Sequence, residues 1–517
     1  DDTNVGNIDN ASSEIANDEA QMENVTSEVA TESGEEQEKV ESVNDYLYRV
    51  LNDGTVEIMG YTGKDTTVNI PETIQGKTVS SIGKEAFKEN VTIENVTIPK
   101  NVTILQYMSF ASCSNLQKII FSADSKLKTI GERAFLQCSK LEGVNCPDSL
   151  ESIKDYAFSD CKSMINIVFG KSLKTIGKSA FVWSGLKSVD IQDSIIDVGA
   201  GAFTNCEQLE NVYLGSGLVE IKEWTFSGCS NLNKIVIPNN IKNIGAEAFL
   251  HSGLKSVNIP NSVLSVGKRA FMNCYDLSEV DIGNGISYIA ESAFESCNLN
   301  KIVINNKIEY IQDHAFEYNT TLKEISIPKN VTEIQYSVFK GCEALEKIDF
   351  PDTLEKIGGF SFKGTKWLAD QKDGVVYAGK VLYTYKGDMP KETSIDVKKG
   401  TKGISGFAFD DQVKLKSISI PEGVTNIGDY AFHNCSSMTQ ISIPKSVNEI
   451  GEYALGYKEV NDGTQGERYE SSRYSKWGYH TVIPGFVIYG EAGSAAEKYA
   501  EQNSINFKKN VYTVIFK

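Results

Sequence analysis

The chain has 517 residues, with 69 acidic against 51 basic side chains and a net charge of −18 at pH 7. This charge argues against a nucleic-acid partner, because binding to phosphate requires clustered lysine and arginine, and against attraction to an anionic membrane surface. The sequence contains no uninterrupted run of about 18 apolar residues, so we expect no membrane insertion.

Residues 1–45 hold most of the negative charge. They contain 14 acidic residues and one basic residue, a net charge of −13, whereas the rest of the chain has a net charge of −5. No aromatic residue occurs before Tyr46. Such a segment cannot bury enough apolar surface to offset the entropy of ordering, so the sequence predicts an acidic, disordered linker over 1–45. A coiled coil is the alternative, although no heptad pattern supports it. The first residue is not Met, so we expect a removed signal peptide or a trimmed start.

An internal repeat organises the remaining sequence. A Phe, replaced by Leu455 in the last unit, recurs at steps of 22 or 23 residues, apart from one step of 25 and one of 47, which gives sixteen units. An aliphatic residue lies five positions before it, from Ile82 to Ile450, and a short side chain lies directly before it. These positions predict a packed interior with a neighbouring coil above and below. Gly follows the aliphatic residue in nine units, where we expect a tight turn that uses the conformational freedom of glycine.

Each unit also carries a strand pattern, for example Ile325-Ser326-Ile327-Pro328. The alternation predicts a short β-strand with one buried face, and proline ends it because proline cannot donate to a ladder. One strand per unit at constant spacing predicts a single parallel sheet. The sequence therefore predicts one elongated, strand-dominated solenoid of about sixteen coils over 81–455, rather than the several domains that the length suggests.

The unit Ile-Gly-x-x-Ala-Phe-x-x-Cys-x-x-Leu-x-x-Ile-x-Ile-Pro resembles the BspA-like class of leucine-rich repeats, an α/β repeat class, over about residues 45–507. Three further segments resemble features of that family. Residues 46–80 resemble its amino-terminal β-hairpin cap with a turn at Asn52-Asp53-Gly54, residues 366–400 its inserted hairpin, and residues 456–510 its carboxy-terminal loop and capping helix. Ser494 and Glu497 also have the spacing of an N-terminal capping box. Residues 511–517 alternate like the first strand of a further β module.

Nine of the ten cysteines lie three residues after a unit Phe, and Cys146 lies in a strand. We expect all ten to face the core as buried, reduced thiols. Neighbours such as Cys138 and Cys161 could still approach disulfide distance.

The sequence shows no motif that carries chemistry. No Cys-x-x-Cys pair occurs. The four histidines, His251, His314, His433 and His480, lack metal-ligand spacing and are expected on surface loops. We therefore predict no enzyme activity, no metal and no cofactor.

The outward-pointing strand residues form an extended face, on which we predict contact with an extracellular protein partner. Its candidate residues are Asp190, Tyr213, Lys234, Asn258, Asp281, Lys301, Ser326 and Asp349. A merely solvated face is the alternative.

Two segments that interrupt the repeat offer the aromatic and arginine side chains that are typical of interfaces and sugar sites. Their candidate residues are Trp367, Tyr377, Tyr383 and Tyr385 in the first segment and Tyr469, Arg473, Tyr474 and Trp477 in the second. Packing of these residues onto the solenoid is an equal alternative.

The family resemblance implies a secreted or cell-surface bacterial protein with a role in adhesion, whereas spacing and composition imply only a binding scaffold without chemistry. A carbohydrate-recognition module that uses the aromatic insert loops, with a glycan as partner, and a passive structural spacer are the alternatives. We expect a monomer.

Overall fold

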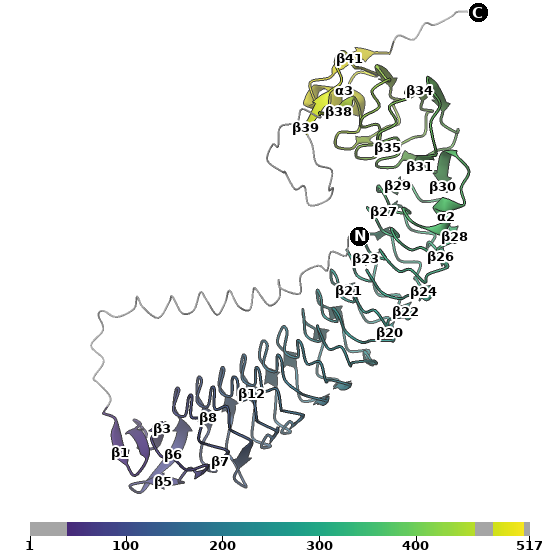
Figure 1. Cartoon of the computed structure of the whole chain (residues 1–517). Coiled ribbons are helices and arrows are strands. Elements are labelled where there is room, and N and C mark those ends of the chain that lie inside the picture. Colours follow the sequence, from purple (N-terminus) through teal and green to yellow (C-terminus); the bar gives the residue numbers. More distant parts are fainter. Residues whose placement is uncertain (1–38, 461–478, 511–517) are drawn as a thin grey trace, which may run out of the picture.

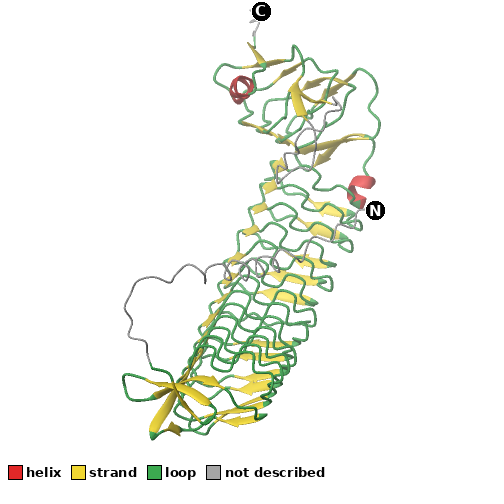
Figure 2. Ribbon diagram, turned by 60° about the vertical axis from the view of Figure 1, so that its left-hand side comes forward, coloured by secondary structure: helices red, strands yellow, loops and turns green. Residues whose placement is uncertain are grey.

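A computed structural model describes residues 39–460 and 479–510, which form a curved solenoid (Figure 1). Each typical unit contributes a two-residue strand on the inner side of the arc and, in most coils, a longer strand on its outer side. The unit Phe lies in the turns between the two strands. Figure 2 shows that strands and loops make up nearly all of the molecule. The strand-dominated repeat solenoid predicted from the sequence is confirmed.

The strands fall into two series. The inner strands are β6 (Lys77–Ile82), β8 (Ile104–Leu105), β10 (Thr129–Ile130), β12 (Ser152–Ile153), β14 (Thr175–Ile176), β16 (Asp197–Val198), β18 (Glu220–Ile221), β19 (Asn243–Ile244), β21 (Ser265–Val266), β23 (Tyr288–Ile289), β25 (Tyr310–Ile311), β27 (Glu333–Ile334), β29 (Lys356–Ile357), β33 (Gly403–Ile404), β35 (Asn426–Ile427) and β37 (Glu449–Ile450). The outer strands are β4 (Thr67–Asn69), β7 (Asn95–Ile98), β9 (Lys118–Phe121), β11 (Gly143–Asn145), β13 (Asn166–Val168), β15 (Ser188–Ile191), β17 (Asn211–Leu214), β20 (Ser256–Ile259), β22 (Glu279–Ile282), β24 (Lys301–Val303), β26 (Glu324–Ser326), β28 (Lys347–Asp349), β32 (Thr393–Asp396), β34 (Leu415–Ser419), β36 (Gln440–Ser442), β40 (Val487–Gly490) and β41 (Asn506–Lys509).

The remaining elements belong to the caps and inserts. They are β1 (Glu41–Val43), β2 (Tyr46–Val50), β3 (Val56–Tyr61), β5 (Thr73–Ile74), α2 (Lys366–Ala369), β30 (Gly374–Ala378), β31 (Val381–Lys386), β38 (Tyr457–Val460), β39 (Tyr479–Val482) and α3 (Ala495–Gln502). No helix within the described ranges is both long enough and apolar enough to cross a bilayer.

Strands of successive coils pair in parallel at equivalent positions. On the inner side Ile130 pairs with Ile153, and on the outer side Ser188–Ile191 pairs residue by residue with Asn211–Leu214. The single long sheet that we expected is instead divided into successive sheets of two to ten strands. Such short strands make few ladder hydrogen bonds each, so a small rotation between coils, of the kind that gives sheets their twist, interrupts the ladder.

The unit phenylalanines form a stack through the core. From Phe87 to Phe362, the ring centroids of successive coils lie 4.7–5.8 Å apart and the ring planes are within 18° of parallel. These rings are almost completely buried. From Phe110 to Phe339, each ring is covered on both sides by rings from neighbouring coils, so no coil can bury its own Phe alone.

The ten cysteines are buried free thiols, as predicted. The nine that follow a unit Phe each donate to the carbonyl oxygen of the Phe one coil earlier, at 3.0–3.3 Å. Asn319 takes the place of cysteine in one coil, and its side chain donates to the oxygen of Phe294 at 2.8 Å. The position therefore favours a small side chain that carries a hydrogen-bond donor, because the carbonyl oxygen is buried.

Glycine after the inner strand has a different role from the predicted one. A Cβ atom on Gly131 would lie 2.5 Å from the carbonyl oxygen of Leu105 one coil earlier, and Gly131 does not have a positive φ. The prediction of a turn that uses the freedom of glycine was wrong, since these glycines permit close approach of coils. Left-handed conformations occur instead two residues before and two residues after the Phe, for example at Arg133 (φ 55°) and Gln137 (φ 59°).

The amino-terminal hairpin predicted from the sequence is present as β2 and β3, with Gly54 at a φ of 81° in the turn. Strand β1 pairs antiparallel with β2, from Glu41 opposite Tyr48 to Val43 opposite Tyr46. This pairing corrects the prediction of a disordered linker over 1–45 for the residues of β1, because the ladder hydrogen bonds are accompanied by packing of Val43 against the core. Residues 1–38 lie outside the described ranges.

The inserted hairpin interrupts both the core and the inner ladder. Strands β30 and β31 pair antiparallel, and β31, rather than β29, pairs with the inner strand β33. The Phe stack stops at Phe362 and resumes with Phe409 on Phe432. On the inner side the coils on either side of the insert stay in contact, since Ser405 Oγ donates to the oxygen of Ile357 at 2.7 Å. The hairpin therefore separates the Phe rings of two coils that stay in contact near Ile357, and the arc curves towards its inner side at this point (Figure 1).

Helix α3 closes the carboxy-terminal end, as predicted. The Ser494 hydroxyl accepts a hydrogen bond from the Glu497 amide, and the Glu497 carboxylate accepts one from the amide of Gly493. Ala496, Tyr499 and Ala500 of the helix are buried, and the Tyr499 hydroxyl accepts a hydrogen bond from the Leu455 amide at 3.1 Å. The helix thus covers the last unit. Residues 511–517, which we predicted to begin a further β module, lie outside the described ranges.

Candidate functional site

The solvent-exposed surface of the outer strands, which we call the outer face, carries the eight residues predicted to contact a partner. All eight are exposed, namely Asp190, Tyr213, Lys234, Asn258, Asp281, Lys301, Ser326 and Asp349. Several are direct cross-strand partners: Asp190 with Tyr213, Asn258 with Asp281, and Ser326 with Asp349. The alternation of the sequence thus places these residues together on one surface.

Apolar side chains also lie exposed in the central row of the outer face. They are Ile120, Val168, Tyr213, Val236 and Val303, which are between 50% and 68% exposed. They are interspersed along the row with polar residues such as Asn258 and Asp281. Single exposed apolar residues are ordinary, but a row of them among lysines and carboxylates matches the mixed character of protein-binding surfaces.

The aromatic residues of the first insert are mostly used inside the molecule. Tyr383 is buried, its hydroxyl accepts a hydrogen bond from the Phe362 amide at 2.9 Å, and its ring lies 5.0 Å from that of Phe362. The Trp367 ring also lies 5.0 Å from the Phe362 ring. Burial raises the pKa of Tyr383 above its usual range. These two side chains cover the face of the Phe362 ring that a Phe of the next coil would otherwise cover. Their role is therefore explained by packing within the protein.

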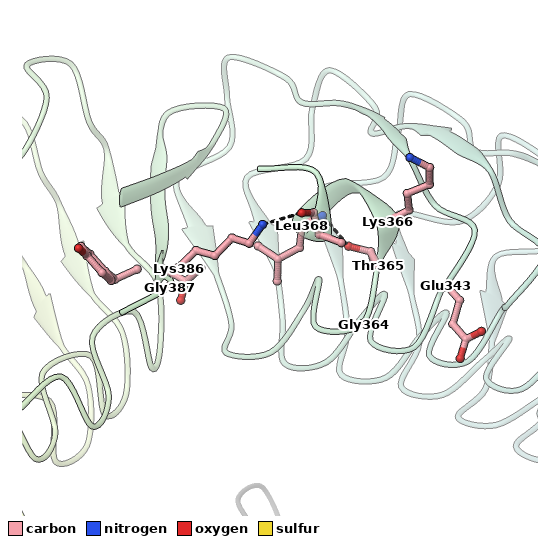
Figure 3. A pocket seen from close by; sticks show the side chains of 10 residues that line it. Glu343, Gly364, Thr365, Lys366, Leu368, Lys386 and Gly387 are labelled. Carbon is pink, nitrogen blue, oxygen red and sulfur yellow. Dashed lines mark hydrogen bonds between the residues drawn. The ribbon is translucent and has the colours of Figure 1, made fainter. Parts of the chain in front are cut away.

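The other two aromatic residues of the insert are less buried. Tyr377 accepts a hydrogen bond from the Lys398 amide at 3.0 Å, and the Lys398 ammonium lies 4.4 Å from the centre of its ring. Tyr385 contributes to the lining of an open groove of about 690 Å³ between the insert and the coil of Phe362 (Figure 3).

The polar groups of this groove bond within the protein. The Lys386 ammonium donates to the carbonyl oxygens of Ala369 and Gln371 at 2.5 Å, and the Thr365 hydroxyl accepts from the Leu368 amide at 3.1 Å (Figure 3). These bonds hold the end of α2 against β31. The groove is therefore explained by the attachment of the insert.

The candidates of the second insert, Tyr469, Arg473, Tyr474 and Trp477, lie outside the described residues. The strands that lead into and out of this segment, β38 and β39, pair antiparallel with Lys458 opposite Thr481. Strand β39 carries His480 next to the last coils of the solenoid.

His433 joins a polar cluster that the sequence did not predict. The His433 side chain is buried, its Nδ1 lies 2.9 Å from Asp410 Oδ1, and its Nε2 lies 3.1 Å from His480 Nδ1. The expectation of a surface histidine was wrong for His433, because β39 covers it. Asp410 and His433 follow the unit Phe in neighbouring coils, so superposition of the units indicates their contact, whereas nothing in the sequence connects them to His480.

A second titratable cluster lies nearer the amino terminus, where Glu317 and Lys340 also directly follow the unit Phe. The buried Glu317 carboxylate pairs with His314 Nδ1 and with the Lys340 ammonium, the latter at 2.7 Å. Burial opposes the charged form of His314, but the hydrogen bond and charge of Glu317 outweigh it and raise the His314 pKa. Burial raises the pKa of the neighbouring Glu295. This cluster is an ion-pair network between neighbouring coils.

The sequence profile described as "BspA type Leucine rich repeat region (6 copies)" matches residues 61–184, 151–278, 242–369 and 383–466. The chain belongs to the BspA type leucine-rich repeat family. The matched residues span the solenoid, so this BspA type protein is built on its family's repeat over most of its length.

Solved structures of similar proteins include three bacterial leucine-rich repeat proteins. A protein from Bacteroides ovatus is 25% identical, with 73% of this chain and 99% of that chain covered and a TM-score of 0.48. A leucine rich cell surface protein from Faecalibacterium prausnitzii is 26% identical, with coverages of 62% and 96% and a TM-score of 0.40. A T. pallidum protein is 26% identical, with coverages of 46% and 91% and a TM-score of 0.31. None of the curated proteins matches the chain.

Proposed function

We propose that this BspA type protein is a non-catalytic, secreted or cell-surface binding protein that adheres to proteins of a host or of neighbouring cells through its outer face. The observation that carries the proposal is the row of exposed residues from Ile120 to Asp349, in which apolar side chains are interspersed with charged and polar ones. An extended, mixed surface of this kind suits a protein partner contacted at many points.

The charge of the outer face supports a partner with its own mixed surface. Lys301 pairs across the ladder with Glu279, and Lys347 lies 3.5 Å from Glu324. Since the two signs are interspersed along the strands, long-range attraction is weak and short-range complementarity determines which partner binds.

The non-catalytic part of the proposal is supported by the bonding of the polar clusters. Glu317 and Lys386 each have their polar atoms engaged by protein groups. Hydrolytic turnover of any polymer by the purified protein contradicts this part of the proposal.

A binding screen with matched charge reversals tests the role of the outer face. The full chain is presented to host extracellular-matrix proteins on a biosensor, alongside the double variant Lys234→Glu/Lys301→Glu. The control is Lys174→Glu/Lys242→Glu, which makes the same charge change beside the inner strands. We expect the first variant to weaken a protein hit at least about tenfold, equivalent to 1.4 kcal/mol, and the control to leave it unchanged. Equal losses in both variants contradict a specific role for the outer face.

A glycan array separates the two alternatives. Glycan hits that disappear in Trp477→Ala, with no protein hits, favour a carbohydrate-recognition module. The bonding of Lys386 and Thr365 argues against a sugar site in the groove beside the first insert. No binding in either screen favours a passive spacer.

A further inference from the structure

The cluster around His433 brings together three side chains that are typical metal ligands. One ligand atom each from Asp410, Asp411 and His433 can be chosen so that all three lie within 4.8 Å of one another. Asp410 and Asp411 come from one coil and His433 from the next, so the three ligands meet at the contact between two coils.

The environment of His433 sets this cluster apart from an ordinary group of surface carboxylates. The His433 side chain is 1% exposed and that of Asp410 is 9% exposed, whereas Asp411 is exposed. A buried imidazole is thus held beside a carboxylate that faces solvent, and this gives the cluster a route of entry. The Asn434 side chain donates to Asp411 Oδ1 at 2.7 Å and fixes the orientation of that carboxylate.

We propose that Asp410, Asp411 and His433 form a binding site for one divalent transition-metal ion of the Zn²⁺ class, with His480 as a positioning residue. Imidazole nitrogen and carboxylate oxygen are usual ligands of Zn²⁺, and a site with three protein ligands leaves one position for water. The site joins the last coils of the solenoid, and it is independent of the outer face and of the adhesion proposed above.

His480 fits the role of a supporting residue behind the ligand. A metal ion takes the Nδ1 lone pair of His433, so the imidazole proton must lie on Nε2. The His480 Nδ1 atom, 3.1 Å from that Nε2, is placed to accept it. Metal-bound histidines commonly donate their second N–H in this way, which fixes the tautomer and the ring orientation. Asp410, Asp411 and His480 also make other interactions, which metal binding would rearrange in part.

Calorimetric titration of the full chain with ZnCl₂ tests the site, with excess Mg²⁺ present to occupy non-specific carboxylates. We expect one Zn²⁺ site per chain that Asp411→Asn and His433→Gln abolish. For His480→Gln we expect affinity to fall by about 10- to 100-fold, as for other supporting residues of metal-bound histidines. The control is His251→Gln, since His251 is bonded to Asn273 and lies in a distant coil; it should bind Zn²⁺ like the wild type.

Thermal unfolding provides a second measurement that separates binding from folding. Asp411 is exposed, so Asp411→Asn should unfold at the wild-type temperature without metal and lose only the rise in Tm that Zn²⁺ gives the wild type. The proposal is overturned if Zn²⁺ fails to bind the wild type or binds Asp411→Asn equally well. Either result would mean that the cluster only holds neighbouring segments together through hydrogen bonds.

Discussion

The side-chain amide of Asn426 donates a hydrogen bond to the main-chain oxygen of Glu355 at 3.0 Å, although a complete coil lies between them in sequence. The intervening coil has Gly403 at the equivalent position, where a Cβ atom would lie 2.2 Å from the same oxygen. The lack of a side chain at Gly403 lets Asn426 reach across. Lys356 and Glu449 form an ion pair over the same bend. These contacts join the inner side of the coils before the insert directly to the inner side of the coils after it.

Substitution of Asn426 should loosen this bend. Asn426→Ala leaves the oxygen of Glu355 without the amide, and we expect it to lower the free energy of unfolding by about 1–3 kcal/mol. Urea unfolding with a probe in the last coils measures the loss. Asn243→Ala is the matched control, because Asn243 also begins an inner strand but is exposed; its cost should stay within about 0.5 kcal/mol. Equal costs in the two variants would show that the contact across the bend is not stabilising.

Truncation of one stacked ring should weaken two coil contacts at once. The Phe226 ring lies 5.7 Å from that of Phe203 and 5.6 Å from that of Phe249. Phe226→Ala should cost about 3–5 kcal/mol in unfolding free energy. Phe226→Leu should cost clearly less, since Leu455 occupies the same unit position. Chemical denaturation of both variants gives the comparison, and indistinguishable midpoints would argue against the stack.

The thiols should be unreactive in the folded protein. Burial raises the pKa of Cys206 and of Cys274 to about 12, although hydrogen bonds with Ser184 and Ser252 oppose the shift. A buried thiol with this pKa is neutral at pH 8, and the thiolate is the form that reacts. We expect iodoacetamide to modify none of the ten cysteines of the native protein at pH 8 and all of them in urea, as counted by mass spectrometry. Rapid labelling of any unit cysteine under native conditions would contradict this.

The same thiols should make stability fall at high pH. Their folded-state pKa of about 12 lies above the reference value of 9.0, so their contribution is complete below pH 9 and is lost as pH rises through the folded-state pKa. Between the two values the free energy of unfolding falls as pH rises, because the unfolded chain has released the thiol proton and the folded chain has not. Denaturation should be measured at several pH values between 8 and 11. The free energy of unfolding should fall less steeply with pH for Cys206→Ser/Cys274→Ser than for the wild type.

The pKa of His314 should lie above the reference value of 6.5 and that of His251 below it. Glu317 raises the His314 pKa, whereas burial lowers that of His251. The raised pKa means that the stabilisation from His314 is complete below pH 6.5 and is lost as pH rises through the folded-state value. NMR titration of the imidazole signals measures both groups. Glu317→Gln should lower the His314 pKa and leave that of His251 unchanged; the reverse order in the wild type would refute the assignment.

The fold could be predicted because the same pattern of residues recurs in sixteen units. A single Ile-x-Ile segment is ambiguous, but the same buried and exposed positions recur in every unit, so the local signals reinforce one another. Asp190 and Tyr213 are neighbours because they hold the same position in successive units. The outer face and the buried thiols follow from the positions of residues within one unit, because these positions recur in every coil.

Features that join different kinds of segment could not be predicted. The contact of His433 with His480 depends on where β39 folds back, and no periodicity relates that strand to the coils. The bend depends on how the inserted hairpin packs between the coils, and a step of 47 residues in the sequence does not determine that packing. Even within a unit the role of Gly131 was misread, because close approach to Leu105 is a property of two coils.

The stack of phenylalanines makes the span of the molecule adjustable. Since each ring meets only the rings next to it, removing residues 227–249 would join Phe226 to Leu250 at equivalent positions and leave the cross-section unchanged. The protein would become shorter by about 5 Å, the spacing of adjacent strands. Evolution can therefore lengthen or shorten the protein by duplicating or deleting single units, without redesigning a core.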